Sequence, residues 1–290
     1  MSDGGRFAVL VNAQTHMVVE PATGRALGGF GAAFHRPWVF PLYTPRGLTV
    51  VQEFPFDHPF HNGVFVGQNP VVLGDAAVNF WAAPPRRGFD DALFAQPPGR
   101  MAAVGEPQAV VGPDGATFAL DLVWRDAEER PVLTERRTVA LYAVGDATVC
   151  ETASEKTAAF GPLRFPRTKF GSIGLRAEPR LLPPLGGEVI ADGRRGGAEV
   201  AHESEARWVA YEAADGLGGR FGVLMCRPDP GAAGPWFVRD YGMALWNPTW
   251  AGDVALPEGE TWRLALRVVA YDGPVAVDRA AAWANIPARA

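Results

Sequence analysis

Short apolar runs that alternate with polar residues, each bounded by turn residues, constrain the fold of this chain more than any other feature. From residue 108 onward, alternating runs are divided by turn signals such as 113–115 and 145–146. The run 261–271 carries Trp, Leu and Val on one face and Arg and Ala on the other. A period of two residues is typical of half-buried β-strands. The 34 glycines and 26 prolines follow no collagen repeat, which indicates many turns between many short strands.

These runs predict an all-β fold, because no βαβ rhythm or internal repeat interrupts them. Roughly fourteen to eighteen strands favour a large antiparallel sandwich over one small barrel. Residues 38–43 and 48–53 are expected to form a hairpin, and the pattern-poor stretch 82–105 a long loop. One short C-terminal helix is predicted at 277–285, where it would cover a sheet edge. No linker divides the chain, so residues 1–290 are expected to form a single β-sandwich domain.

Composition argues against several classes of partner. The net charge is −5 and no basic stripe is present, which argues against nucleic acid as a main partner. No apolar run reaches the ~20 residues of a membrane helix, and the amino terminus lacks the features of a signal peptide. We therefore expect a soluble, cytoplasmic protein without a membrane partner. Cys150 and Cys226 lie in apolar runs and are expected to be buried, reduced thiols.

Residues 35–67 contain the strongest candidate site. Three of the five histidines lie there, two of them in the sequence Asp57-His58-Pro59-Phe60-His61. Residues three apart in a regular strand point to opposite faces, but Pro59 breaks the strand, and a turn would bring both imidazoles together. Neutral imidazoles serve as acid, base or metal ligand near pH 7. The alternative is a structural turn in which Asp57 is a cap and both histidines bond to backbone carbonyls.

The spacing H-x-x-H matches no specific zinc signature, so no residue is assigned as a metal ligand. A divalent metal is nevertheless left open as a cofactor, because His35, Glu53 and His202 are available as further ligands for a site at His58 and His61.

Three later segments combine charges with aromatic rings among turn residues: 167–176, 202–208 and 236–248. Sugars stack on such rings while fixed polar groups bind their hydroxyls; the alternative is a surface ion pair beside a core aromatic. The candidate catalytic residues are His58, His61, Lys169 and Glu203. The candidate substrate-binding residues are Arg36, Tyr43, Arg176, His202, Arg239, Tyr241 and Asn247.

Several motifs resemble a bacterial family of unknown function that carries a methane-oxygenase-like label. They include RPWVFPLYTPRG, DHPFHNGVFVG, TKFGSIGLR and WFVRDYGMALWNP, and the resemblance extends over residues 36–273. The family more often has two adjacent histidines where this chain has Phe60-His61, and a histidine near Ala270-Tyr271. The particulate methane oxygenase is a membrane protein and this chain has no span, so the resemblance implies work on carbohydrates rather than methane.

Taken with the strand pattern, the resemblance predicts a sandwich like those of galactose mutarotases. The expected function is that of an isomerase, lyase or hydrolase acting on a sugar or an oxidised keto-glycoside, with His58 and His61 as an acid/base pair. The partner is then a small saccharide. Two alternatives are a non-catalytic sugar-binding sandwich and a metal-dependent oxygenase or lyase with the same histidines as ligands. The sequence leaves the sugar, the bond and the oligomeric state open.

Overall fold

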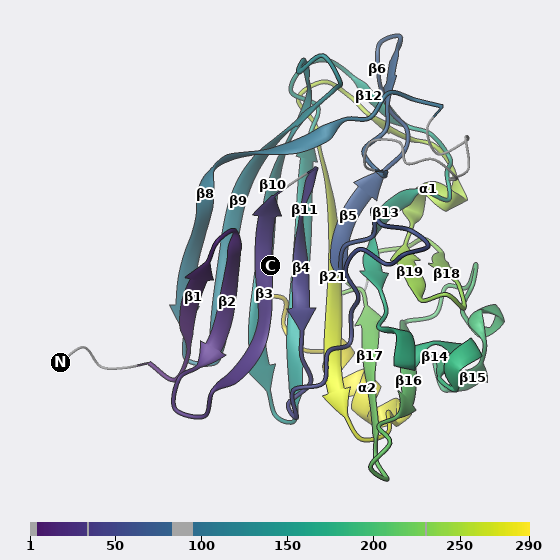
Figure 1. Ribbon diagram of the computed structural model, residues 1–290. Coiled ribbons are helices and arrows are strands. Elements are labelled where there is room, and N and C mark those ends of the chain that lie inside the picture. Colours follow the sequence, from purple (N-terminus) through teal and green to yellow (C-terminus); the bar gives the residue numbers. More distant parts are fainter. Residues whose placement is uncertain (1–4, 34, 83–94, 230) are drawn as a thin grey trace.

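Two large antiparallel sheets face each other in the computed structural model, which describes residues 5–33, 35–82, 95–229 and 231–290 (Figure 1). The predicted all-β antiparallel sandwich is thereby confirmed. The eight-stranded sheet has the order β1 (Ala8–Asn12), β2 (Thr15–Glu20), β3 (Arg25–Ala33), β4 (Arg36–Leu42), β5 (Val64–Gln68), β13 (Gly171–Arg176), β19 (Met243–Trp246) and β18 (Trp236–Val238).

The second sheet has nine strands, and a small four-stranded sheet lies at one end of the sandwich (top of Figure 1). The nine-stranded sheet has the order β15 (Arg194–Gly196), β14 (Glu188–Ala191), β16 (Trp208–Ala214), β17 (Arg220–Cys226), β21 (Thr261–Asp272), β11 (Ala147–Thr157), β10 (Pro131–Val144), β9 (Gly115–Arg125) and β8 (Arg100–Gly112). The small sheet has the order β20 (Val254–Leu256), β12 (Leu163–Phe165), β6 (Val71–Leu73) and β7 (Ala76–Val78).

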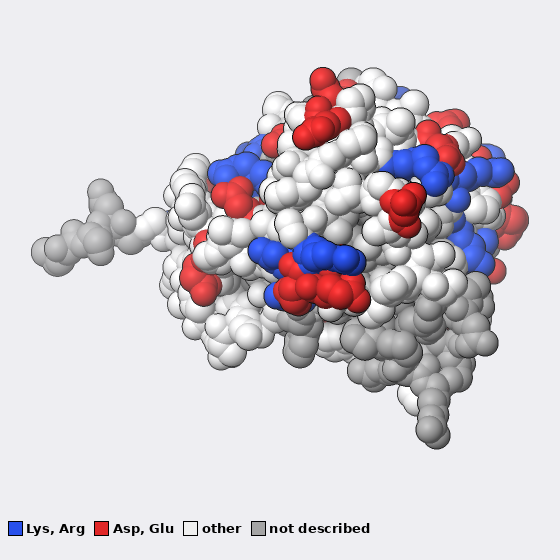
Figure 2. Space-filling model, turned by 90° about the horizontal axis from the view of Figure 1, so that it is seen from above, with Lys and Arg blue, Asp and Glu red and all other residues white. Residues whose placement is uncertain are grey.

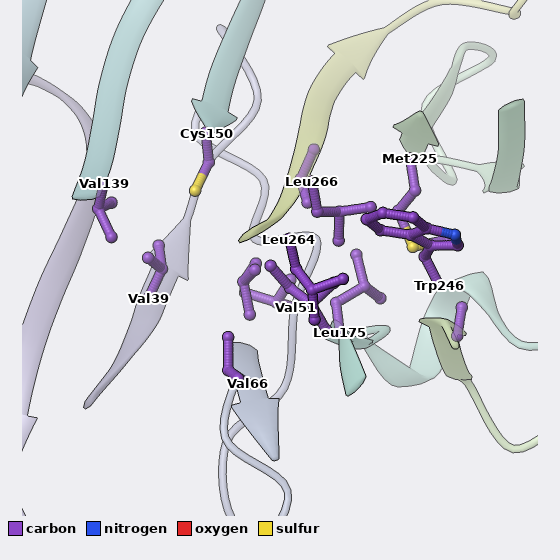
Figure 3. Packing of buried hydrophobic residues seen from close by; sticks show 14 of the residues in the cluster. Val39, Val51, Val66, Val139, Cys150, Leu175, Met225, Trp246, Leu264 and Leu266 are labelled. Carbon is purple, nitrogen blue, oxygen red and sulfur yellow. The ribbon is translucent and has the colours of Figure 1, made fainter. Parts of the chain in front are cut away.

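The main hydrophobic core fills the space between the two large sheets. Figure 3 shows Val39 and Val66 from the eight-stranded sheet in the same cluster as Val139 and Leu266 from the nine-stranded sheet. On β21, Leu266 and its neighbours at two-residue spacing enter this core, as their alternation predicted. Burial of such side chains contributes about 25 cal/mol for each Å² of apolar surface removed from water, so this interface is the main source of stability. Both cysteines are buried and unpaired by disulfide, as predicted.

Helix α2 (Val277–Ala284) covers a sheet face, not the edge where the sequence placed it. Its Trp283 ring lies 5.1 Å from that of Tyr271 on β21. The prediction failed because the second face of β21 is also apolar near its end, at Val269 and Tyr271, and needs cover. The one other α-helix in the described ranges is the single turn α1 (Pro248–Ala251). No helix in these ranges is both long enough and apolar enough to cross a lipid bilayer.

Two segments differ from the predicted pattern. The expected loop 82–105 includes residues 83–94, which lie outside the described part of the chain, and it ends early because β8 begins at Arg100 and pairs with β9. The expected hairpin of 38–43 with 48–53 forms only next to its turn, where Tyr43 bridges Thr49, because Val51 bridges Ala177 and Glu53 bridges Asn62 instead. The turn itself does form, with the Gly47 amide donating to the Thr44 carbonyl at 2.9 Å. The ladder then stops because residues 51 and 53 pair with other segments.

The pleat of the eight-stranded sheet produces a second apolar layer on its outer face. On β5, Val64 and Val66 enter the main core, while Phe65 between them points to the other side. The outer cluster consists of Trp38, Phe60, Phe65, Trp81, Ala82, Phe237, Met243 and Leu245. This layer supports the loop that contains both histidines, so the candidate site lies on the outside of the sandwich and not between its sheets.

Gly63 is predicted to be essential where that loop rejoins β5. Its φ is +53°, and a Cβ there would lie 2.0 Å from the Val39 carbonyl oxygen. Gly74 is a matched control, because its φ is +56° and a Cβ there would meet no atom within 4 Å. Left-handed backbone alone costs a non-glycine residue about 1–2 kcal/mol, so we expect that loss for Gly74→Ala and about 3–5 kcal/mol for Gly63→Ala. Urea unfolding measures both; equal losses would contradict the predicted clash.

Candidate functional site

A tight turn brings the two histidines of the DHPFH segment together. The His61 amide donates to the His58 carbonyl at 2.9 Å, and Pro59 occupies the second position of this turn, where its fixed φ is favourable. The two imidazole rings are stacked, with centroids 4.7 Å apart and planes 4° from parallel. In a straight strand the two rings would point to opposite faces of the sheet. The turn at Pro59 therefore places them side by side.

His58 is oriented by a carboxylate that is itself held by an arginine. Nη2 of the buried Arg176 donates to both oxygens of Asp57 at 2.8 and 2.7 Å, and Asp57 Oδ2 lies 2.9 Å from Nδ1 of His58. Burial raises the pKa of Asp57, but the hydrogen bonds from Arg176 and His58 outweigh it and hold the pKa below its usual value. A carboxylate only accepts, so Nδ1 of His58 donates and Nε2 is left for a ligand.

His61 has a different environment from His58. Its ring is buried, and its Nδ1 lies 3.5 Å from Nη1 of Arg176. Burial lowers the pKa of His61 well below its usual value, and the charges of His58 and Arg176 lower it further. The ring is therefore neutral at physiological pH. Because arginine only donates, Nδ1 is the acceptor and the proton of His61 lies on Nε2, which makes this nitrogen a hydrogen-bond donor.

Both rings belong to a longer stack that fixes their planes. Tyr241 stacks on His58 at 5.0 Å, and His61 lies 5.8 Å from Phe65. The nitrogen lone pairs of parallel rings lie in parallel planes, so they do not converge on one ion. In the described ranges no group of three or more His, Cys, Asp or Glu side chains is placed to hold a metal. This geometry does not fit a metal bound jointly by His58 and His61.

The stack forms one wall of a pocket with a volume of 260 Å³. Small-molecule sites typically measure about 300–1,000 Å³, so this pocket suits a ligand the size of one sugar ring. In the described part of the chain, its lining comes from four separate segments and consists of His58, His61, Trp81, Lys169, Phe170, Phe237, Arg239 and Tyr241.

The basic residues of the pocket lie on loops that are tied to the scaffold. Lys169 follows Thr168, whose carbonyl accepts from Nδ2 of the buried Asn247 at 2.8 Å. Arg239 begins the turn between β18 and β19, and its carbonyl accepts from the Tyr211 hydroxyl at 2.7 Å. The guanidinium of Arg239 lies over a ring of the outer cluster, 4.2 Å from the centroid of Phe237. These contacts hold both cations beside the histidines.

Arg36, a predicted substrate-binding residue, is 1% exposed and is not among the residues that line the pocket. Its Nη2 donates to the carbonyl oxygens of Phe60, at 2.8 Å, and Trp81, and its Nε donates to His35 Nε2 at 2.7 Å. Burial, and then the charge of Arg137, lowers its pKa to about 9. Arg36 therefore braces the backbone on two sides of the pocket instead of reaching a ligand.

Five other predicted residues also lie outside the lining, Arg176 among them. His202 contacts it indirectly, edge-on to the Phe237 ring at 5.2 Å. Glu203 is exposed and accepts from the Trp250 indole at 3.2 Å. Tyr43 directly follows β4, at the start of the loop that leads to the histidines, and its backbone forms a bridge to Thr49. Asn247 is fully buried under the Lys169 loop. The structure thus brings together His58, His61, Lys169, Arg239 and Tyr241, with Arg176 behind them.

Sequence reasoning missed three aromatic members of the lining. Phe170 and Phe237 adjoin predicted basic residues in the sequence, so the mixed charge and aromatic pattern could have identified them. Trp81 had no such signal, because its position depends on the side chain of Asn79, whose Oδ1 accepts from the Trp81 amide at 2.8 Å.

Comparison with known proteins places the chain in a family without assigning a function. A model of the family of unknown function DUF6807 matches residues 31–285. No curated protein sequence matches the chain. A candidate aldose 1-epimerase from Escherichia coli K12 is 11% identical with a TM-score of 0.35, covering 94% of this chain and 100% of that one. A galactose mutarotase-related enzyme from Lactobacillus acidophilus is 11% identical with a TM-score of 0.29, covering 91% and 97%. Similarities this weak carry no argument about activity.

The ion pair between Arg176 and Asp57 predicts a specific dependence of stability on pH. A folded-state pKa below the ordinary 3.8 means that this carboxylate stabilises the fold above pH 3.8, and that the stabilisation is lost as the pH falls through the folded-state value. Asp57→Asn should therefore lower the free energy of unfolding at about pH 6, and its difference from wild type should shrink at about pH 3. Urea unfolding at both pH values measures this, with exposed Asp75→Asn as control. A pH-independent difference would contradict the assignment.

Proposed function

We propose that this chain, which belongs to the family of unknown function DUF6807, is a carbohydrate-active enzyme. It is an isomerase, lyase or hydrolase that acts on a sugar or an oxidised keto-glycoside by acid/base catalysis. The observation that carries the proposal is the relay from Arg176 through Asp57 to His58 at the wall of a pocket. A base whose far nitrogen is fixed by a carboxylate is the usual arrangement for moving a proton at a substrate.

In the proposed reaction, Nε2 of His58 removes a proton from a hydroxyl group or from a carbon next to a carbonyl. The imidazolium that forms is stabilised by Asp57, which accepts from Nδ1 at 2.9 Å. The same proton then returns to another atom of the substrate, such as the ring oxygen or the oxygen of a leaving group. A positioned acid/base group of this kind typically contributes about 10²–10⁴-fold to the rate.

The remaining polar groups of the pocket are suited to stabilise the negative charge that such a proton transfer creates. His61 offers an Nε2–H donor without a positive charge, because burial keeps its ring neutral by lowering its pKa. Lys169 and Arg239 add cationic donors on the lining of the same pocket. Fixed donors aimed at developing charge are among the largest contributions to catalysis. An enolate-like oxygen is the charge that this set fits best.

The saccharide half of the proposal is supported by the apolar part of the lining. Trp81, Phe170 and Phe237 supply ring surfaces beside the polar groups, and the C–H face of a sugar packs against such rings. The carbohydrate role implied by the sequence motifs agrees with this composition. A non-catalytic binding site would not need the carboxylate relay behind His58, so an enzyme accounts for more of the geometry than a binding protein does.

Replacing His58 tests the catalytic role. On a substrate identified from a panel of glycosides and their keto forms, His58→Gln should lower kcat by about 10²-fold or more, with little change in stability, because the proton acceptor is lost. Asp57→Asn should lower kcat in the same direction, since the tautomer is no longer fixed. His16→Gln, on β2 and outside the pocket lining, is the matched control and should retain kcat in the folded fraction. A folded His58→Gln variant with full activity would refute the proposed mechanism.

A further inference from the structure

The pocket has an unbalanced charge. Among the residues that the structure describes, its lining contains two cations, Lys169 and Arg239, and no carboxylate. In the described part of the chain, neither cation makes an ion pair. Many charges elsewhere on the surface lie against a partner of opposite sign, as the adjoining blue and red groups in Figure 2 show. For a chain with a net charge of −5, two cations in one small pocket that have no ion-pair partner among the described residues require an explanation.

Two carboxylates close to these residues, Asp57 and Asp240, are engaged elsewhere and do not neutralise the cations. Asp57 forms its ion pair with Arg176. Asp240, next to Arg239 in the sequence, directs Oδ1 to the Ala198 amide at 2.7 Å. Asp240 therefore does not neutralise Arg239, although the two residues are adjacent in the sequence.

Most donors of the two cations remain available. The Nζ of Lys169 lies 5.1 Å from the Phe170 ring centroid, and Arg239 stacks on Phe237 at 4.2 Å. Only one guanidinium N–H has a partner in the described ranges, the Val238 carbonyl at 3.3 Å. Arginine carries five N–H donors and lysine three. The aromatic rings thus position both cations without using the donors that a ligand would need.

We infer that the ligand of this pocket is an anionic saccharide, whose carboxylate or phosphate group is bound by Lys169 and Arg239. The inference rests on the proposed function for its saccharide half, and on the charge of the lining for its anionic half. His61 contributes a further donor through Nε2–H, so the polar lining consists largely of donors. Such a lining complements an acceptor-rich anion, and charge-assisted hydrogen bonds to it are roughly twice as strong as neutral ones.

Calorimetric titration with matched acidic and neutral sugars tests the inference. The probes are a panel of uronates, their uronamides and hexose 6-phosphates, titrated into the His58→Gln variant, in which turnover is expected to be about 10²-fold slower or more. We expect the best acidic sugar to bind about tenfold or more tightly than its neutral partner, and its affinity to fall as salt is added. A preference for uronate or for sugar phosphate identifies which anion the pocket selects.

Substitution of each cation tests whether it binds the anion. Lys169→Gln and Arg239→Gln should each weaken the binding of the acidic sugar by about tenfold, while the affinity for the neutral sugar changes little. Arg194→Gln, which removes an exposed positive charge on β15, is the control and should have no effect. Uronamides that bind as tightly as uronates, or variants with unchanged affinity, would overturn the inference.

The outcome is separable from that of the proposed catalysis, because binding is measured apart from turnover. Failure of every acidic sugar to bind at millimolar concentration would overturn the inference, whatever the kinetics of the His58 variants. If acetate or inorganic phosphate binds as tightly as the acidic sugars, the saccharide half is refuted.

Discussion

The ion pair between Arg176 and Asp57 is the interaction on which the site depends. It connects the end of β13 to the loop before β5, two segments that are far apart in the sequence. Arg176 is buried and has no other carboxylate partner in the described ranges, so removing Asp57 would leave a buried cation unpaired, which is costly. The same carboxylate fixes the ring of His58. Stability of the loop and orientation of the catalytic candidate therefore have one common origin.

The rest of the scaffold makes this interaction precise enough for chemistry. Alternation along β4, β5, β18 and β19 sends one set of side chains into the main core and the other into the outer cluster under the pocket. The buried Arg36 then donates hydrogen bonds to the carbonyl oxygens of Phe60 and Trp81. Sites need their supporting residues locked by packing and hydrogen bonds, and here the pocket loops are anchored to a buried layer and also stack on one another, as Tyr241 does on His58. The site therefore lies on the face of the eight-stranded sheet that points away from the sandwich core.

Periodicity made the sandwich predictable, because a strand with one buried face leaves a two-residue pattern. The convergence of His58 and His61 was predictable for a local reason, the proline between them. The burial of Arg36 was not, since its partners besides His35 are backbone carbonyls more than twenty residues away and carbonyls leave no mark in a sequence. His202 carried the same signal as Arg239, a charge beside an aromatic ring, yet only Arg239 lines the pocket. The pattern identifies candidate loops, but the fold decides which side chains reach the cavity.

The central claim is that Asp57 holds His58 with its proton on Nδ1, leaving Nε2 for the substrate. Nitrogen-15 NMR of the neutral His58 ring measures this tautomer directly. The account predicts an Nδ1–H tautomer in the wild type, and a shift toward the Nε2–H tautomer, usual for an unconstrained ring, in Asp57→Asn. A wild-type His58 that carries its proton on Nε2, or a tautomer unaffected by Asp57→Asn, would contradict the account.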